Sequence, residues 1–187
     1  SSFEYLLLIH LPLVLSAALL PLFGFPILYL PIHIVWLELI IHPSAILAFQ
    51  SKARAGGARS ATGFFDFNDV ARILFSGTLI LAAIAWFSIR DFQAGLGEDV
   101  LRTRAVGCLA LWSAGLVVVL TKGQGLVSKT IAITTVLASV LLIQYGAAMG
   151  RYLHVVPLDL RQWSEIFVAV FVTSTITWFI KSGAVRR

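Results

Sequence analysis

The sequence predicts an all-α, polytopic membrane protein, a bundle of six transmembrane helices. Hydrophobic residues make up 59% of the chain and charged residues only 12%, whereas about 25% charged residues is usual for a soluble domain. The mean hydropathy is +0.93. Six long apolar runs follow one another without the alternation of apolar and polar residues that barrel strands show. Helices are expected because a helix satisfies its own backbone hydrogen bonds in lipid.

The first two predicted spans, residues 4–22 and 28–49, are joined by a short turn at 23–27. Each is a run of about 20 apolar residues, long enough to cross the bilayer. The short turn makes them a helical hairpin. After them, residues 55–63 are rich in Gly, Ala and Ser, a composition typical of a flexible loop.

The third to fifth predicted spans are residues 69–89, 101–120 and 129–149, each an apolar window between charged or turn-rich breaks. The sixth span, 161–180, begins with a capping box. In this motif Asp159 is the N-cap, Gln162 stands three residues on, and Trp163 follows at the membrane interface. Residues 1–187 therefore form a single transmembrane domain.

Lys and Arg are unevenly divided between the two ends of the spans. An even number of spans places both termini on one side, which carries nine Lys and Arg residues against five on the other. The nine are Lys52, Arg54, Arg59, Arg72, Lys122, Lys129, Lys181, Arg186 and Arg187, and the five are Arg90, Arg102, Arg104, Arg151 and Arg161. The positive-inside rule predicts cytoplasmic termini. It also accounts for the net charge of +5 without a nucleic-acid partner.

Soluble-type catalytic motifs are absent from the sequence. It contains no Gly-rich phosphate loop after a strand and no credible Ser/His/Asp arrangement. The single cysteine, Cys108, has no second cysteine with which to form a disulfide or a thiolate metal site. Any chemistry is therefore expected from polar groups inside the spans.

Glu38 and two histidines form the predicted site. A carboxylate near the bilayer centre costs about 2.5–3.5 kcal/mol, so Glu38 should face the bundle interior. His42 is four residues further on, on the same helix face. His10 and His42 should lie at one level of the hairpin, each about 10 Å deep, with Glu38 about one turn further in. His33 should point to another face, nearer the membrane surface.

Two prolines interrupt this hairpin. Pro43 lacks the N–H that would bond the Leu39 carbonyl, and Pro12 does the same to the Leu8 carbonyl. Broken helices in ion transporters use such freed carbonyls, together with side chains, to hold a cation near the midplane. The sequence therefore predicts an ion path that contains His10, Glu38, His42 and Pro43.

The run from residue 24 to residue 49 resembles the end of the fifth and the whole of the sixth membrane helix of cation-transporting P-type ATPases, especially bacterial calcium-pump-like members. The residues that carry the resemblance are Gly24, Pro26, Pro31, Trp36, Leu37, Glu38 and Pro43. His10-Leu11-Pro12 is similar to the His-x-Pro of the bacterial fifth helix. Weaker similarity continues through Arg102-Thr103-Arg104-Ala105 and through Leu158-Asp159-Leu160 with Gln162-Trp163.

The resemblance implies that the six spans are the fifth to tenth helices of such a pump, its C-terminal membrane domain. It implies ATP-driven cation transport through a phospho-aspartate, in a bacterial plasma membrane. The chain lacks the Asp-Lys-Thr-Gly phosphorylation motif and begins Ser-Ser-Phe-Glu without an initiator Met, so we expect a fragment of a longer protein. ATP and Mg would be bound by the missing domains, and no cofactor is expected in this chain. The expected partners are the lipid bilayer, the transported cation, and the missing N-terminal membrane helices and cytoplasmic domains.

Two positions depart from the family pattern. His42 stands where the family has a ligand Asp, and Ser113 stands near a carboxylate found in the eighth helix of some calcium pumps. Imidazole is a poor ligand for Ca²⁺, which prefers oxygen. It suits a transition metal held by Glu38 and His42, or a proton relay between them.

Two other classes of protein remain open at this point. Histidines at one depth on different helices, His10 and His42, could be the axial ligands of a haem b in a membrane electron carrier. Alternatively, the chain is a stand-alone six-helix protein that serves as an accessory subunit or a scaffold.

Overall fold

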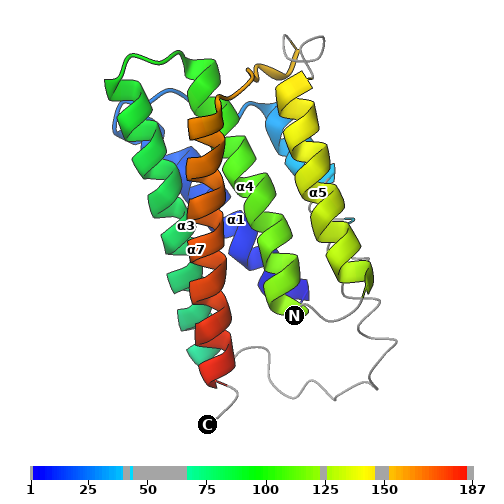
Figure 1. Cartoon of the computed structure of the whole chain (residues 1–187). Helices are drawn as coiled ribbons and strands as arrows, with labels where there is room; N and C mark the ends of the chain where they lie inside the picture. The colour runs from blue at the N-terminus through cyan, green and yellow to red at the C-terminus, as the bar shows by residue number, and fades with distance from the viewer. Residues whose placement is uncertain (1, 40–42, 44–66, 123–125, 146–151, 185–187) are drawn as a thin grey trace.

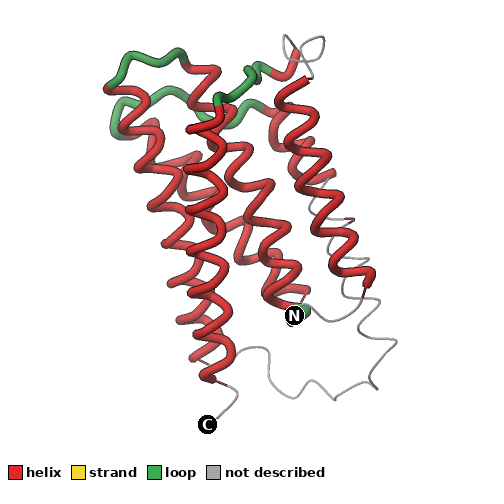
Figure 2. The backbone as a smooth tube through the Cα atoms, in the orientation of Figure 1, coloured by secondary structure: helices red, strands yellow, loops and turns green. Residues whose placement is uncertain are grey.

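The computed structural model describes residues 2–39, 43, 67–122, 126–145 and 152–184. All regular secondary structure in these ranges is helical, which confirms the predicted all-α membrane bundle (Figures 1 and 2). The principal helices are α1 (Ser2–Leu22), α3 (Phe67–Gln93), α4 (Glu98–Leu120), α5 (Leu126–Tyr145) and α7 (Leu160–Ala184). Residues 31–39 are also helical.

Within the described ranges, four helices are long and apolar enough to cross a membrane. They are Phe3–Leu22, Val70–Gln93, Glu98–Leu120 and Leu160–Ser182, and each matches a predicted span to within a few residues. The apolar part of α5, Lys129–Tyr145, is shorter. The second predicted span, 28–49, is described only over 28–39 and at residue 43.

The helices run up and down beside one another (Figure 1). One end of the bundle, here called the loop end, carries the connections 23–30, 94–97 and 155–159. At the opposite end, the terminal end, α1 begins and α7 ends. Contacting helices are antiparallel in the pairs α3–α4, α4–α5 and α3–α7, and parallel in the pairs α1–α3 and α4–α7.

The central element is α4. It packs against α1, α3, α5 and α7, and 89% of its most apolar window is buried, against 28–39% for the other three spanning helices. Two of its glycines face different neighbours. A Cβ on Gly107 would lie 3.5 Å from Ile143 of α5, and a Cβ on Gly115 would clash with the Ser174 hydroxyl of α7. Small residues thus allow close helix approach on more than one side.

The connection after α1 is longer than the predicted turn at 23–27, because the chain stays non-helical through residue 30. Gly24 turns the chain with a φ of +84°, a conformation that suits glycine. Pro31 disfavours a helical conformation in the residue before it but is well suited to the first turn of a helix. Three non-helical residues at 28–30 can cover up to about 10 Å instead of about 4.5 Å in a helix. The helix that follows can therefore be displaced by up to about one turn.

The capping box at the start of α7 is confirmed. The backbone N–H of Gln162 donates to Asp159 Oδ1 at 2.7 Å, and the backbone N–H of Asp159 donates to Gln162 Oε1 at 2.9 Å. Two N–H groups that the helix itself cannot satisfy are thereby paired, which sets the beginning of α7 at Leu160.

Candidate functional site

His10 and Glu38 are in direct contact between the two helices of the predicted hairpin. His10 Nε2 lies 3.0 Å from Glu38 Oε1. His10 is eight residues from the start of α1, about 12 Å along the helix. The side chains are 36% and 29% exposed, whereas the adjacent Ile9 and Leu37 are fully buried. The pair therefore lies at the margin of the apolar core, well inside the span.

Both ring nitrogens of His10 make contacts. His10 Nδ1 lies 2.8 Å from the Leu6 carbonyl oxygen, which can only accept, so Nδ1 donates to it. Nε2 faces the Glu38 carboxyl group. The imidazole therefore links the α1 backbone to the Glu38 side chain.

The depth of Glu38 differs from the sequence-based expectation, which placed it one turn deeper than His10. The structure places the two side chains opposite one another, and the non-helical residues 28–30 allow a displacement of this size. His42 lies outside the described residues, so its predicted alignment with His10 stays a prediction. Pro43 is helical and exposed.

The Leu8 carbonyl is not a free ligand, contrary to the prediction from Pro12. Trp112 of α4 donates its indole N–H to this oxygen at 3.3 Å. Trp112 is fully buried and 104 residues away in sequence, so no local pattern could reveal the bond. The backbone hydrogen bond that Pro12 removes from α1 is therefore replaced by a bond from a side chain, and the carbonyl is not left for an ion.

His33 lies two residues into the helix that begins at residue 31, next to the loop end, which agrees with the expected position nearer the membrane surface, and its side chain is fully buried there. The Leu30 backbone N–H donates to His33 Nδ1 at 3.2 Å, and Nε2 donates to the Leu153 carbonyl. Both ring nitrogens are thus used in tying the start of the 31–39 helix to the segment before α7. This is a structural role, on a different side of the helix from Glu38.

The geometry of His10 bears on the haem alternative. Both of its ring nitrogens already make hydrogen bonds, so axial ligation of a haem iron would require breaking one of them. Among the residues that the structure describes, no three His, Cys, Asp or Glu side chains gather in a way that could hold a metal ion. Cys108 is free and buried.

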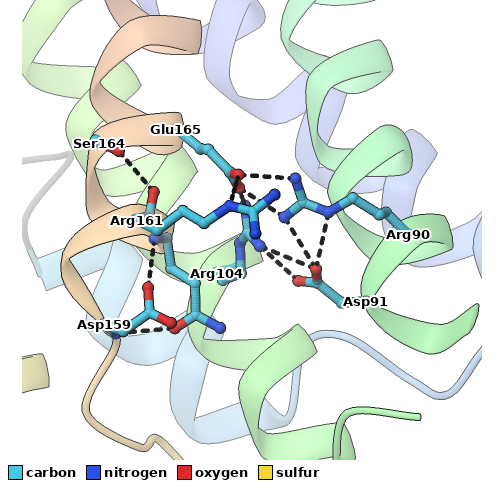
Figure 3. A network of polar contacts seen from close by, with 8 residues as sticks. Arg90, Asp91, Arg104, Asp159, Arg161, Ser164 and Glu165 are labelled. Atoms are coloured by element: carbon cyan, nitrogen blue, oxygen red, sulfur yellow. Dashed lines mark hydrogen bonds and ion pairs between the residues drawn. The ribbon is translucent and has the colours of Figure 1, made fainter. Parts of the chain in front are cut away.

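A network of ion pairs at the loop end was missed by the sequence analysis (Figure 3). Arg104 of α4 donates to both oxygens of Asp91 at 2.9 and 2.8 Å, and the two side chains are only 2% and 3% exposed. Arg104 also donates to Glu165 of α7 at 2.6 Å. These contacts join α3, α4 and α7 through one arginine.

Two further arginines complete this loop-end network. Arg90 donates to the two oxygens of Glu165 at 2.8 and 2.6 Å and to Asp91 at 3.1 Å. Arg161, which is 80% exposed, donates to Glu165 at 3.2 Å. With three arginines and two carboxylates, the formal charge is 3 − 2 = +1. The sequence pointed to this network in one respect, because Arg104 lies inside a predicted span, where an isolated charge is costly.

A second cluster lies at the terminal end. Arg72 of α3 donates to Glu4 of α1 at 2.8 Å, and Lys181 of α7 lies 3.6 Å from the other Glu4 oxygen. Glu4 and Arg72 are each 9% exposed. Sequence analysis had treated these cations only as charges at the ends of spans, whereas the structure uses them to join three helices.

Comparisons with known proteins do not assign this chain, because no family model matches it and no curated protein matches it.

Proposed function

We propose that this chain contributes part of the ion path of an ATP-driven cation transporter, as the C-terminal membrane domain of a P-type ATPase of the bacterial calcium-pump-like kind. The contact between His10 and Glu38 carries the proposal. Ionisable groups within spans are costly, and in membrane proteins they mark ion and proton pathways. The sequence resemblance places these two residues on the family's fifth and sixth helices.

The geometry of the pair suggests how a cation would bind. Glu38 would offer carboxylate oxygens, which hard cations prefer as ligands, and His10 would hold that carboxyl group in place. About a third of each side chain is exposed, which leaves room for ligands from outside the described bundle. In the proposed pump these come from His42, from the carbonyl freed by Pro43 and from the missing N-terminal membrane helices.

The proposed setting is a bacterial plasma membrane with cytoplasmic termini. The excess of Lys and Arg on the terminal side supports this orientation. The ATP- and Mg-binding domains would then be connected at the end where α1 begins, about 12 Å from His10 along the helix. Movement of α1 would couple those domains to the ion path.

The test uses the whole protein encoded by the gene that contains this chain, purified and reconstituted into proteoliposomes. Glu38→Gln removes the charge at nearly constant size, so the cation concentration for half-maximal ATP hydrolysis should rise at least about tenfold, the equivalent of one hydrogen bond to a charged group. His10→Ala should lower transport and change its pH dependence. Glu98→Gln, the same chemical change at an exposed side chain, is the matched control.

Wild-type ion activation in both Glu38→Gln and His10→Ala would remove the pair from the ion path. His42→Ala tests the third predicted member in the same assay. The reading frame upstream of Ser1 is an independent check, since the proposal requires an Asp-Lys-Thr-Gly motif there.

A further inference from the structure

The helix at residues 31–39, which carries Glu38, follows a connection that does not fix its level in the bundle. Residues 25–30 are non-helical, and each such residue can cover any length up to about 3.4 Å. Arg102 of α4 donates to the Ile27 carbonyl at 3.0 Å, but residues 28–30 separate this bond from the helix. The level and the rotation of the helix therefore depend on its own contacts with other elements.

His33 joins the first turn of this helix to the segment before α7. The Leu30 backbone N–H donates to His33 Nδ1 at 3.2 Å, so Nε2 carries the hydrogen and donates to the Leu153 carbonyl. His33 is fully buried and Leu153 is 6% exposed. Little water can compete for a hydrogen bond in such a place, which strengthens it.

The segment that accepts this bond, residues 152–156, is itself held on the central helix. The Val156 backbone N–H donates to Thr103 Oγ1 of α4 at 2.9 Å. Thr103 is fully buried, and its hydroxyl donates in turn to the Asp99 carbonyl at 2.6 Å. The Leu153 carbonyl therefore has a fixed place relative to α4.

The 31–39 helix carries the position of His33 over to Glu38. Glu38 is five residues further on, about 7.5 Å along the helix, and Leu37, one turn after His33, is fully buried. A helix moves as a unit over such a short length, so a shift or rotation at His33 moves Glu38 with it. Glu38 Oε1 lies 3.0 Å from His10 Nε2, and a displacement of one turn would separate them.

We propose that His33 is a positioning residue for Glu38. Its bond to the Leu153 carbonyl fixes the level and rotation of the 31–39 helix, so that residues 152–156, at the loop end, control whether Glu38 meets His10. This inference rests on the proposed function, because Glu38 is the carboxylate of the proposed ion path. His33 itself touches no cation and acts only through the helix.

The position of the helix can be measured without a transport assay. In the whole protein, with reactive cysteines outside this chain replaced, spin labels are attached at Val14→Cys on α1 and Val35→Cys on the 31–39 helix. Both sites are more than half exposed, at 58% and 55%, and the native Cys108 is buried and should not react. Dipolar electron paramagnetic resonance then gives the distance between the labels.

Two substitutions of His33 separate its hydrogen bond from its bulk. His33→Leu removes the donor and should shift or broaden the distance by up to about one helical turn, roughly 5 Å. His33→Gln has a side-chain amide that can donate to the same carbonyl, so it should keep the wild-type distance. A wild-type distance in His33→Leu, or an equal change in both variants, would overturn the proposal.

The opposite end of the link supplies a second variant, for use if His33→Leu is not monodisperse. Thr103→Val keeps the size of the side chain but removes the oxygen that accepts from Val156, so it should also change the distance; an unchanged distance would then overturn the proposal. Thr177→Val is the matched control. It removes a hydroxyl that joins α7 to Ser76 of α3, and it should leave the distance as in the wild type.

ATP hydrolysis by the reconstituted protein connects this position to the ion path. Loss of one net hydrogen bond makes displaced positions of the helix about fivefold more populated relative to the correct one. The cation concentration for half-maximal hydrolysis should therefore rise about fivefold in His33→Leu and return to near the wild-type value in His33→Gln.

The two proposals fail in different ways. Unchanged cation activation in Glu38→Gln removes the ion path, and the label distances still decide whether His33 positions the helix. A changed activation in Glu38→Gln with wild-type activation in His33→Leu keeps the ion path and overturns the role of His33.

Discussion

Arg104 and Asp91 keep full charges in the interior of an apolar bundle because each neutralises the other. The carboxylate accepts two hydrogen bonds from one guanidinium, and the Arg104 guanidinium also lies 4.4 Å from the centre of the Phe87 ring. A buried ion pair adds little net stability over an apolar pair, but removing one partner leaves an uncompensated charge. The arrangement is therefore sensitive to single substitutions.

Asp91→Asn should lower the free energy of unfolding by about 3 kcal/mol, because it leaves the buried Arg104 with Glu165 as its main anionic partner. Glu98→Gln is the control, since Glu98 is 60% exposed and its pair with Arg102 should contribute less than about 1 kcal/mol. Unfolding in detergent, followed by tryptophan fluorescence, measures both values. If Asp91→Asn and Glu98→Gln lower the free energy of unfolding by similar amounts, burial does not determine how much an ion pair contributes.

His10 and His33 show how the same side chain takes different roles according to its partner. His33 bonds only to neutral backbone groups, so it has a fixed hydrogen-bond pattern. His10 bonds to a backbone carbonyl and to the Glu38 carboxyl group. Of these two histidines, only His10 is joined by these bonds to an ionisable side chain.

At the scale of elements, α1 is stabilised at its proline by α4. Pro12 removes the N–H that would bond the Leu8 carbonyl, and the Trp112 indole replaces it. His10 lies between Leu8 and Pro12 in sequence, so this bond also holds the part of α1 that presents His10 to Glu38. The central helix thus supports the part of α1 that carries the candidate site.

Trp112→Phe should destabilise the protein by about 1–2 kcal/mol, because it leaves the Leu8 carbonyl unpaired in an apolar environment. In a Pro12→Ala background the same substitution should cost less, since the introduced alanine supplies a backbone N–H for that carbonyl. The free energy of unfolding lost in Trp112→Phe should differ between the two backgrounds by at least about 0.5 kcal/mol, which a double-mutant cycle measures.

Trp163→Phe is the matched control for this cycle. Trp163 also donates its indole N–H, in this case to Gln144 at 3.0 Å, and neither residue is near Pro12 in the bundle. Trp163→Phe should lower the free energy of unfolding by the same amount in the wild-type and in the Pro12→Ala background. If Trp112→Phe lowers the free energy of unfolding equally in the wild-type and in the Pro12→Ala background, the indole does not replace the missing N–H.

At the scale of the whole molecule, two ionic clusters mark the two faces of the membrane. Arg72 and Arg90 belong to opposite clusters and are 18 residues apart on α3, about 27 Å along the helix. This separation is close to the thickness of the hydrocarbon core, about 30 Å. The clusters therefore join helices at two levels whose separation matches the two faces of a bilayer.

Orientation can be measured with single cysteines, because the native Cys108 is buried and should not react. Leu96→Cys lies in a connection at the loop end, and Leu126→Cys lies at the start of α5, at the terminal end. A membrane-impermeant maleimide should label Leu96→Cys in intact cells and Leu126→Cys only after permeabilisation. The reverse pattern would contradict cytoplasmic termini, and labelling of both in intact cells would contradict the up-and-down arrangement.

The sequence by itself determined the class of the protein and the approximate bounds of its helices. Apolar runs of spanning length, charges at their ends and the Asp159 capping box are local signals, because they follow from the cost of exposing backbone and charge to lipid. The resemblance of the hairpin to a P-type ATPase also came from local residues, and so did the choice of His10 and Glu38.

Only the tertiary structure decided which polar groups meet. The level of Glu38 depends on three non-helical residues before Pro31, the Leu8 carbonyl is satisfied by a residue 104 positions away, and the loop-end network joins α3, α4 and α7. These contacts depend on helix rotation and on relative depth in the bilayer. Both are set by packing around α4, which couples many weak contacts from distant parts of the chain and leaves no pattern in any single segment.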